Sequence, residues 1–242
     1  MNDKNNMESG LGVGVHYAFF FSNNWSLGSG VEYQYYEGTA KIDALQDFSK
    51  AIDIEGENFD FRYSAVNYNE QQYASYLNIP LIVQYETSGN IRLFLAAGAK
   101  IGFNIKAAYE VEASSLVTSG YYSQYDAELK NPLFAGFGNF GKYETSRSSL
   151  NLSTSYIASG ESGVKFLLEG EQSLYMGLFL DYGLNDISKN EGKDVIAYDN
   201  QNPTSFIGSS LLESKNKITS KDYISDVKTM SFGLKLRYAF GL

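Results

Sequence analysis

The stretch Met230-Ser-Phe-Gly-Leu-Lys-Leu-Arg-Tyr-Ala-Phe-Gly-Leu242 decides the fold, because it alternates strictly between large apolar residues and polar or small ones. Every even-numbered position is apolar, whereas the odd-numbered positions hold serine, glycine, lysine, arginine and alanine. Strict alternation gives a β-strand two chemically different faces. The stretch therefore predicts a strand with one continuous hydrocarbon face.

Six further segments repeat this alternation, so the sequence predicts seven strands of an all-β, antiparallel, up-and-down sheet. These segments are 11–21, 25–35, 77–85, 91–103, 158–168 and 174–184. The segment 158–168 is the weakest, because Ala158, Gly160 and Ser162 complete its apolar face poorly. Across all seven segments the apolar face carries no charged residue.

The opposite face combines glycines with charged residues, which form the candidate site: Glu32, Arg92, Lys100, Glu161, Lys165, Asp181, Lys235 and Arg237. In a soluble sandwich or lipocalin-like barrel, the charged face would meet water and would not need glycine. In a small membrane β-barrel the apolar face meets lipid, and small residues and paired charges fill a narrow lumen. We therefore predict a transmembrane barrel with a lumen charge network, with the soluble barrel as the alternative.

Aromatic residues near the strand ends support a membrane barrel. Such residues form girdles where the hydrocarbon layer meets the headgroups. The predicted interfacial aromatics are Trp25, Tyr33, Tyr35, Tyr85, Tyr238 and Phe240.

The connections between the strands alternate between very short and very long. Residues 22–24, 87–89 and 170–172 are tight turns, and the long connections lie at about 37–72, 107–155 and 186–228. Outer-membrane barrels have short periplasmic turns and longer extracellular loops. The predicted organisation is a polar N-terminal stub (1–10) followed by a barrel domain (11–242) whose three long connections are extracellular loops.

Seven strands conflict with the even strand number of single-chain bacterial barrels. The first and the last predicted strands both run towards the short-turn side, so direct pairing between them would be parallel. We expect a gap or a strained parallel contact between them. We also expect one further alternating strand upstream of Met1, because residues 1–10 are too few and too polar to supply it.

Composition excludes several classes of protein. The 242 residues carry a formal net charge of −9, which argues against a nucleic-acid partner held by phosphate contacts. No cysteine is present, which excludes disulfides and thiolate chemistry. His16 is the single histidine, so no site can use two imidazoles. The sequence predicts no metal ligands and no cofactor.

Three segments carry a resemblance to a known family: Gly12-Val-Gly-Val-His-Tyr17, Asn24-Trp-Ser-Leu-Gly-Ser-Gly-Val-Glu-Tyr33 and Tyr76-Leu-Asn-Ile-Pro-Leu-Ile-Val-Gln-Tyr85. The chain resembles the Bacteroidetes outer-membrane β-barrels of the PorT-like or porin family, and the third segment is the most specific element. The resemblance implies an OmpA-like, eight-stranded barrel in the Gram-negative outer membrane. It also implies contact with membrane lipid and the barrel-assembly machinery. The family's first strand is not found in this chain, and Leu242 follows two residues after the expected terminal aromatic, Phe240.

Three functions are compatible with these features. The leading prediction is a non-enzymatic structural or interaction barrel, with a largely plugged lumen and loops that contact another envelope protein. A narrow solute channel is the second, and a barrel-embedded hydrolase that uses His16 is the third. His16 faces Gly30 if the first turn has three residues, which brings Glu32 within diagonal reach, but no catalytic motif accompanies it.

The interior charges predict ion pairs, because an unpaired buried charge is too costly to keep. Glu161 and Asp181 lie on neighbouring strands and would repel each other without a cation between them. We expect Lys165, Lys235 and Arg237 within salt-bridge reach of Glu161 or Asp181.

Overall fold

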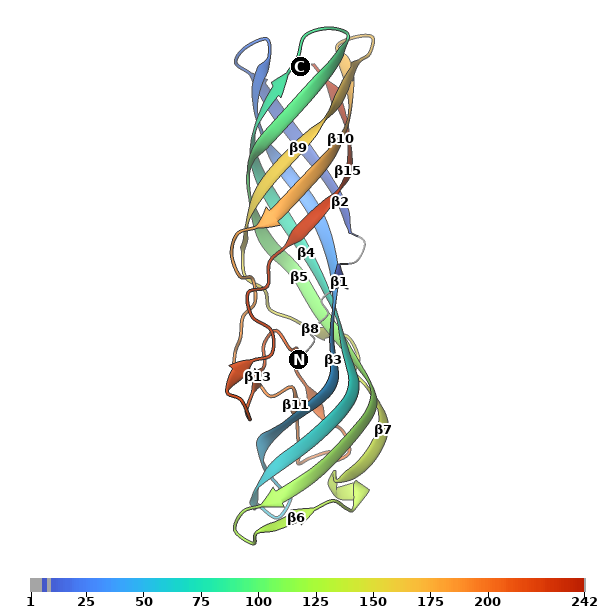
Figure 1. The fold of residues 1–242 in the computed structure, drawn as a ribbon, viewed down its shortest axis with the longest axis vertical. Coiled ribbons are helices and arrows are strands. Elements are labelled where there is room, and N and C mark those ends of the chain that lie inside the picture. Colours follow the sequence, from blue (N-terminus) through green and yellow to red (C-terminus); the bar gives the residue numbers. More distant parts are fainter. Residues whose placement is uncertain (1–5, 8–9, 242) are drawn as a thin grey trace.

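A computed structural model describes residues 6–7 and 10–241, and the described residues form an almost entirely β protein (Figure 1). The strands of ten or more residues are β2 (Leu11–Phe20), β3 (Trp25–Ile52), β4 (Asn58–Glu86), β5 (Ile91–Tyr122), β9 (Ser155–Leu167), β10 (Gln172–Gly183) and β15 (Met230–Phe240). The short elements are β1 (Asn6–Met7), β6 (Ala127–Leu129), η1 (Leu133–Ala135), β7 (Gly138–Glu144), β8 (Ser148–Ser149), β11 (Ile196–Ala197), β12 (Ile207–Gly208), β13 (Lys215–Asn216) and β14 (Lys221–Asp222). Among the described residues, no helix is long and apolar enough to cross a membrane.

The long strands pair with their neighbours in chain order, and every pairing is antiparallel. This confirms the predicted antiparallel meander and the seven predicted segments. The register also follows the prediction at the first turn, where His16 pairs with Gly30. The large apolar residues of these segments lie on the outer surface, as the alternation predicts.

The sheet does not close by backbone pairing in the part of the chain that the structure describes. β2 pairs with β3 alone and β15 pairs with β10 alone, so the predicted gap between the first and last strands is present. The predicted closed barrel is therefore not seen. The strand number also differs from the predicted seven or eight, because the main sheet includes short strands and has 11 in all.

The long connection predicted at 37–72 is not an irregular loop, as the alternating patch Phe59-Asp60-Phe61-Arg62-Tyr63 already indicates. β3 and β4 continue through this range as one long hairpin, and only residues 53–57 form the turn. The prediction for 107–155 is also wrong in part, because β5 continues to Tyr122 and residues 123–149 return along it as β6, β7 and β8. Residues 186–228 are mostly irregular, as predicted. The strands continue because side chains such as Leu45 and Phe61 are buried in a shared apolar core in this region.

The predicted polar stub is only partly described. Asn6 and Met7 form β1, which pairs with Thr39 and Gly38 of β3, so these two residues belong to the sheet. The rest of the stub except Gly10, and the terminal Leu242, lie outside the described residues.

The buried face of β4 changes sides at Asn67. Buried side chains occupy odd positions up to Ala65 and even positions from Tyr68 onward. Asn67 has φ = 52°, a left-handed conformation that asparagine tolerates better than most residues. One residue in this conformation interrupts the alternation, and the following side chains move to the other face. A register shift between Ser75 and Tyr76 against β5 adds a second irregularity nearby.

The described chain has two sections, which lie end to end in Figure 1. We define the barrel section as residues 11–36, 73–106, 155–184 and 230–240, and the extension as residues 37–72, 107–154 and 185–229. The short turns lie at the free end of the barrel section, and the extension continues from the other end.

The apolar core lies almost entirely in the extension. Its strands contribute residues such as Leu45, Phe61 and Leu116, and the 185–229 segment covers them with side chains such as Ile196 and Leu211. The extension therefore folds like a water-soluble domain, whereas the barrel section buries polar side chains and exposes apolar ones.

Candidate functional site

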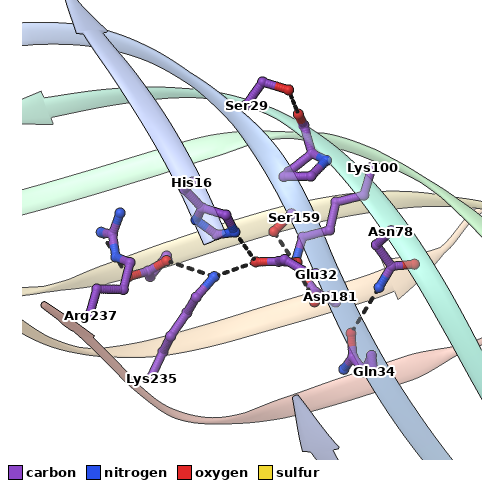
Figure 2. A network of polar contacts seen from close by, with 12 residues as sticks. His16, Ser29, Glu32, Gln34, Asn78, Lys100, Ser159, Asp181, Lys235 and Arg237 are labelled. Carbon is purple, nitrogen blue, oxygen red and sulfur yellow. Dashed lines mark hydrogen bonds and ion pairs between the residues drawn. The ribbon is translucent and has the colours of Figure 1, made fainter. Parts of the chain in front are cut away.

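The interior of the barrel section holds the candidate site (Figure 2). All eight predicted lumen residues point away from the outer apolar face, because they occupy the other parity of each strand. Most of their ion pairs join strands that are not neighbours in the sheet and therefore run across the lumen, whereas Arg92 pairs with Glu86 of the neighbouring strand β4.

Lys100 of β5 lies at the centre of this network and is only 4% exposed. Its Nζ donates to Glu32 Oε2 on β3 at 2.6 Å and to Asp181 Oδ2 on β10 at 2.8 Å. Asp181 also accepts from Ser159 Oγ at 2.6 Å. One buried ammonium thus binds two buried carboxylates, which come from strands on either side of β5 in the sheet. These contacts offset the cost of removing the charges from water.

Glu32 links this centre to β2 and β15. Its Oε1 accepts from Lys235 Nζ at 2.7 Å and lies 3.0 Å from His16 Nε2. The diagonal contact between His16 and Glu32 is as predicted.

Glu161 is bound by the two cations of β15. Arg237 Nη2 lies 2.9 Å from Glu161 Oε1, and Lys235 Nζ lies 3.6 Å from Glu161 Oε2. These pairs match the expectation for Lys235 and Arg237. Asp181 pairs with Lys100, a cation that was not among the three expected near these carboxylates.

A second cluster surrounds Glu86, which was not among the predicted lumen residues. Its fully buried carboxylate accepts from Lys165 Nζ at 2.8 Å and from Tyr175 Oη at 2.7 Å, and Arg92 Nη1 lies 3.4 Å away. Lys165 therefore pairs with Glu86 rather than with Glu161 or Asp181. Glu86 shares the lumen parity of Gln84, but the predicted segment ended one residue earlier, at Tyr85. Extending the alternation by one residue would have found it.

Side chains also link β3 to the last strand, β15. Gln34 Nε2 on β3 donates to Ser231 Oγ on β15 at 2.7 Å, and Asn78 Nδ2 donates to Gln34 Oε1 at 3.2 Å. Together with the Lys235–Glu32 pair, these contacts connect β15 to β3 through the interior of the open sheet.

The lumen is tightly filled. A cavity of about 50 Å³ remains among the network side chains. A Cβ atom at Gly30 would collide with the carbonyl oxygen of Val15, and one at Gly98 would collide with that of Leu81. These close approaches explain why glycine alternates with charged residues on this face. Among the described residues, no group of three histidine or acidic side chains is placed to hold a metal ion.

The predicted interfacial aromatics separate into two levels. Trp25 packs against Tyr85 near the short turns, with ring centroids 5.1 Å apart. Tyr238 and Phe240 are exposed at the same end, on β15 opposite the start of β10. The remaining two lie towards the extension, where Tyr33 is exposed and Tyr35 is half-buried.

Comparison with known proteins gives one match. A family model described as an outer membrane protein β-barrel domain matches residues 1–189. No curated protein matches the chain. No solved structure matches it either.

Proposed function

Because the chain belongs to the outer membrane protein β-barrel domain family and is thereby an integral outer-membrane protein, we propose that it acts as a non-conducting anchor. In this proposal the barrel section holds the extension at the membrane surface, where the extension contacts another component of the cell envelope. The function is binding and presentation rather than transport or catalysis.

The observation that carries the proposal is the position of Lys100 between Glu32 and Asp181. A solute channel needs a continuous water-filled path, and small eight-stranded barrels have interiors that side chains fill. Here, ion pairs from β3, β5, β10 and β15 cross the lumen and leave a cavity of about 50 Å³. This filling supports a plugged lumen.

The extension is proposed to lie outside the cell. Outer-membrane barrels place short turns in the periplasm and long connections on the extracellular side. The turns at 21–24, 87–90 and 168–171 are short, and the extension leaves the other end of the barrel section. A folded extension with its own apolar core supports presentation of a defined surface, because its shape does not depend on a partner.

Membership of the PorT-like group of Bacteroidetes barrels remains a further part of the proposal. The segment Tyr76–Tyr85 supports it, since Pro80 lies within β4 where the resemblance expects a proline. The proposed partners are outer-membrane lipid, the barrel-assembly machinery and an envelope protein bound by the extension.

We also propose that His16 has no catalytic role. Its Nε2 contacts Glu32, and two lysines bind the same carboxylate. A His–Ser or His–Asp hydrolase needs a nucleophile or an activated water beside the imidazole. Among the described residues no hydroxyl is hydrogen-bonded to His16. Esterase and protease assays of the wild-type protein and of His16→Ala should give the same background activity.

Conductance across planar lipid bilayers tests the plugged lumen. The wild-type protein should give no conductance steps, and a stable ohmic conductance would overturn the proposal. Orientation is tested separately in intact cells by an impermeant maleimide, since the chain has no cysteine. Lys50→Cys in the extension should be labelled, and Ser22→Cys in a short turn should be protected.

A further inference from the structure

A groove crosses the outer face of the extension and has a volume of about 760 Å³. Its lining residues come mainly from β3, β4, β5 and β7, at positions that lie opposite one another in the sheet. Outward-facing side chains form two walls that run across the strands. One wall consists of Gln46, Ser64, Val117 and Asn139, and the other of Phe48, Arg62 and Ser119. The backbone of the residues between these walls forms the floor.

Further residues define the two ends of the groove. Lys130 and Asn131, which directly follow β6, line one end. Ile218 lines the other end, beside β3, because the Lys217 N–H donates to Asp47 of that strand. From β3 to β7 the groove crosses about 14 Å, at roughly 4.8 Å between neighbouring strands. Its volume lies in the range of sites for small organic ligands, and its length suits a short chain of linked units.

The side chains that face the groove carry positive charge only. Arg62 and Lys130 are its cations, and their side chains are 44% and 73% exposed. Asp47 also belongs to the lining residues, but its carboxylate is buried on the opposite face, where it accepts from the Lys217 N–H and from Tyr223 Oη. A chain with a formal net charge of −9 thus has a local cationic site here. The charge favours an anionic ligand and disfavours a cationic one.

Arg62 is held in position to receive an anion. Its Cζ lies 4.1 Å from the centroid of the Tyr121 ring, and its Nη1 lies 3.5 Å from Glu128 Oε1. The ring restricts the guanidinium, whereas the long contact with Glu128 uses only part of its donor capacity, since a guanidinium has five N–H groups. A ligand carboxylate can therefore bind Arg62 through paired hydrogen bonds. Glu128 is the competing anion at the rim of the groove.

The other lining side chains match the surface of a sugar. The amides of Gln46, Asn131 and Asn139 both donate and accept hydrogen bonds. Phe48 and Val117 add apolar surface to the same walls. A saccharide presents hydroxyl groups around its rings and C–H groups on their faces, so it can use both kinds of side chain. A saccharide that also carries carboxylates can use the two cations as well.

We propose that this groove binds an acidic oligosaccharide, with one carboxylate on Arg62 and sugar hydroxyls on the amides of the walls. The inference goes beyond the proposed function, because it needs neither a plugged lumen nor a protein partner. The ligand comes from solution rather than from the surrounding lipid. Asp47 in the floor lies about 35 Å along β3 beyond Tyr36, where the barrel section ends, at roughly 3.3 Å per residue. β7, which borders the groove, also lies towards the far end of the extension in Figure 1.

An acidic peptide is the competing occupant, and the geometry favours it less. The floor residues already pair with one another through their backbones, from β3 to β7. A peptide laid across these strands therefore gains no main-chain pairing, which is the usual source of affinity when a sheet binds a peptide. Side chains alone hold a ligand in this groove, and a saccharide binds through hydroxyl groups that suit them.

The test titrates acidic oligosaccharides into the full-length protein in lipid nanodiscs and follows binding by isothermal titration calorimetry. The probes are oligomers of galacturonate, of mannuronate, and of alternating glucuronate and N-acetylglucosamine. At least one should bind. Full methyl esterification of its carboxylates should weaken binding about tenfold, because Arg62 loses a charge-assisted partner. Polyglutamate should bind more weakly than that oligosaccharide.

Two arginines that are held alike provide the matched comparison. Arg62→Ala should weaken binding about tenfold or more. Arg147→Ala is the control, because its Cζ lies 3.8 Å from the Tyr73 ring centroid and its Nε lies 3.5 Å from Glu110 Oε2. Arg147 does not line the groove, so its loss should leave the affinity unchanged. Glu128→Gln removes the competing anion and should strengthen binding by up to about fivefold.

Asn139→Asp tests the opposite wall without removing a contact. The new carboxylate keeps the acceptor that the Gly141 N–H uses and adds a negative charge, so binding should weaken severalfold. Amide hydrogen exchange of β3, β4 and β5 checks that each variant retains the fold.

No binding of any of the three oligosaccharides would overturn the proposal. Equal losses for Arg62→Ala and Arg147→Ala, or equal binding before and after methyl esterification, would overturn it as well. Tighter binding of polyglutamate would assign the groove to an acidic peptide instead.

Discussion

β3, β4 and β5 run through both the barrel section and the extension, but their large apolar side chains lie mostly on the outside in the barrel section and mostly inside in the extension. Leu234 in the barrel section is 83% exposed, whereas Phe61 in the extension is 0% exposed. Charges show the reverse distribution: Lys100 is 4% exposed within the lumen, and the side chain of Lys50 in the extension is 77% exposed. The first section is stabilised by ion pairs inside and lipid outside, and the second by an apolar core inside and water outside.

The difference teaches that alternation specifies a two-faced strand but not the direction of its apolar face. β4 passes through both sections: in the barrel section it buries polar side chains such as Asn78 and Glu86, and in the extension it buries apolar ones such as Phe61. The alternation is the same in both sections, and the surroundings decide which face is apolar.

Loss of the central lumen cation should produce the largest effect. Lys100→Ala leaves Glu32 and Asp181 buried without their shared partner, so we expect the free energy of unfolding in lipid vesicles to fall by about 3–5 kcal/mol. Lys50→Ala removes an exposed pair with Asp60 in the extension and should cost less than about 1 kcal/mol. Urea titration of both variants makes the comparison. Equal losses would mean that the lumen network carries no more stability than a surface pair.

Truncating a large apolar side chain should destabilise the extension much more than the barrel section. Phe61→Ala creates a cavity in the core of the extension and should destabilise that section by about 3–5 kcal/mol. Phe232→Ala removes a lipid-facing ring, leaves no cavity and should cost considerably less. Amide hydrogen exchange resolves the two sections. A comparable loss of protection in both variants would contradict the assignment of the apolar core to the extension.

A charge on the outer face should be tolerated only where that face meets water. Leu234→Arg places a guanidinium in lipid and should cost about 2–4 kcal/mol near the bilayer centre. Gln46→Arg makes the matching change on the outer face of the extension and should change stability by less than about 0.5 kcal/mol. Refolding into vesicles compares them. A neutral effect of Leu234→Arg would refute the membrane orientation of β15.

As the pH rises from 5 to 7, the extension should lose stability while the barrel section should not. Burial raises the pKa of Glu70 to about 7 and the nearby Glu213 adds a like charge, although hydrogen bonds from Ser210, Leu211 and Gln72 oppose the shift. A carboxyl whose pKa is raised by folding stabilises the fold at low pH, and this contribution is lost as pH rises through the folded pKa. We expect a loss of about 2 kcal/mol between pH 5 and pH 7.

Hydrogen exchange of the β4 and β5 amides in the extension measures this loss, with the barrel amides as an internal reference. Glu70→Gln should remove the pH dependence, because its amide cannot ionise. The same slope in wild type and variant would assign the effect to other groups.

The sequence by itself determined the seven long strands, their antiparallel order and the lumen parity of the eight charged residues. Each follows from local information: alternation marks the strands, the short connections between them give their antiparallel order, and glycines alternating with charged residues mark the crowded face. The contact between His16 and Glu32 was predictable for the same reason, since turn length fixes the register of a hairpin.

Only the tertiary structure decided which cation pairs with which carboxylate. It also decided that the long connections fold. Lys100 pairs with Asp181 and Lys165 with Glu86 because curvature brings non-neighbouring strands together across the lumen, which the period of a sequence does not encode. Residues 37–72 were predicted as a long connection because they are acidic and polar, although the patch Phe59–Tyr63 alternates like a strand. They form strands because Leu45, Phe61 and the covering Leu211 bury one another, and that burial exists only after segments about 150 residues apart have met.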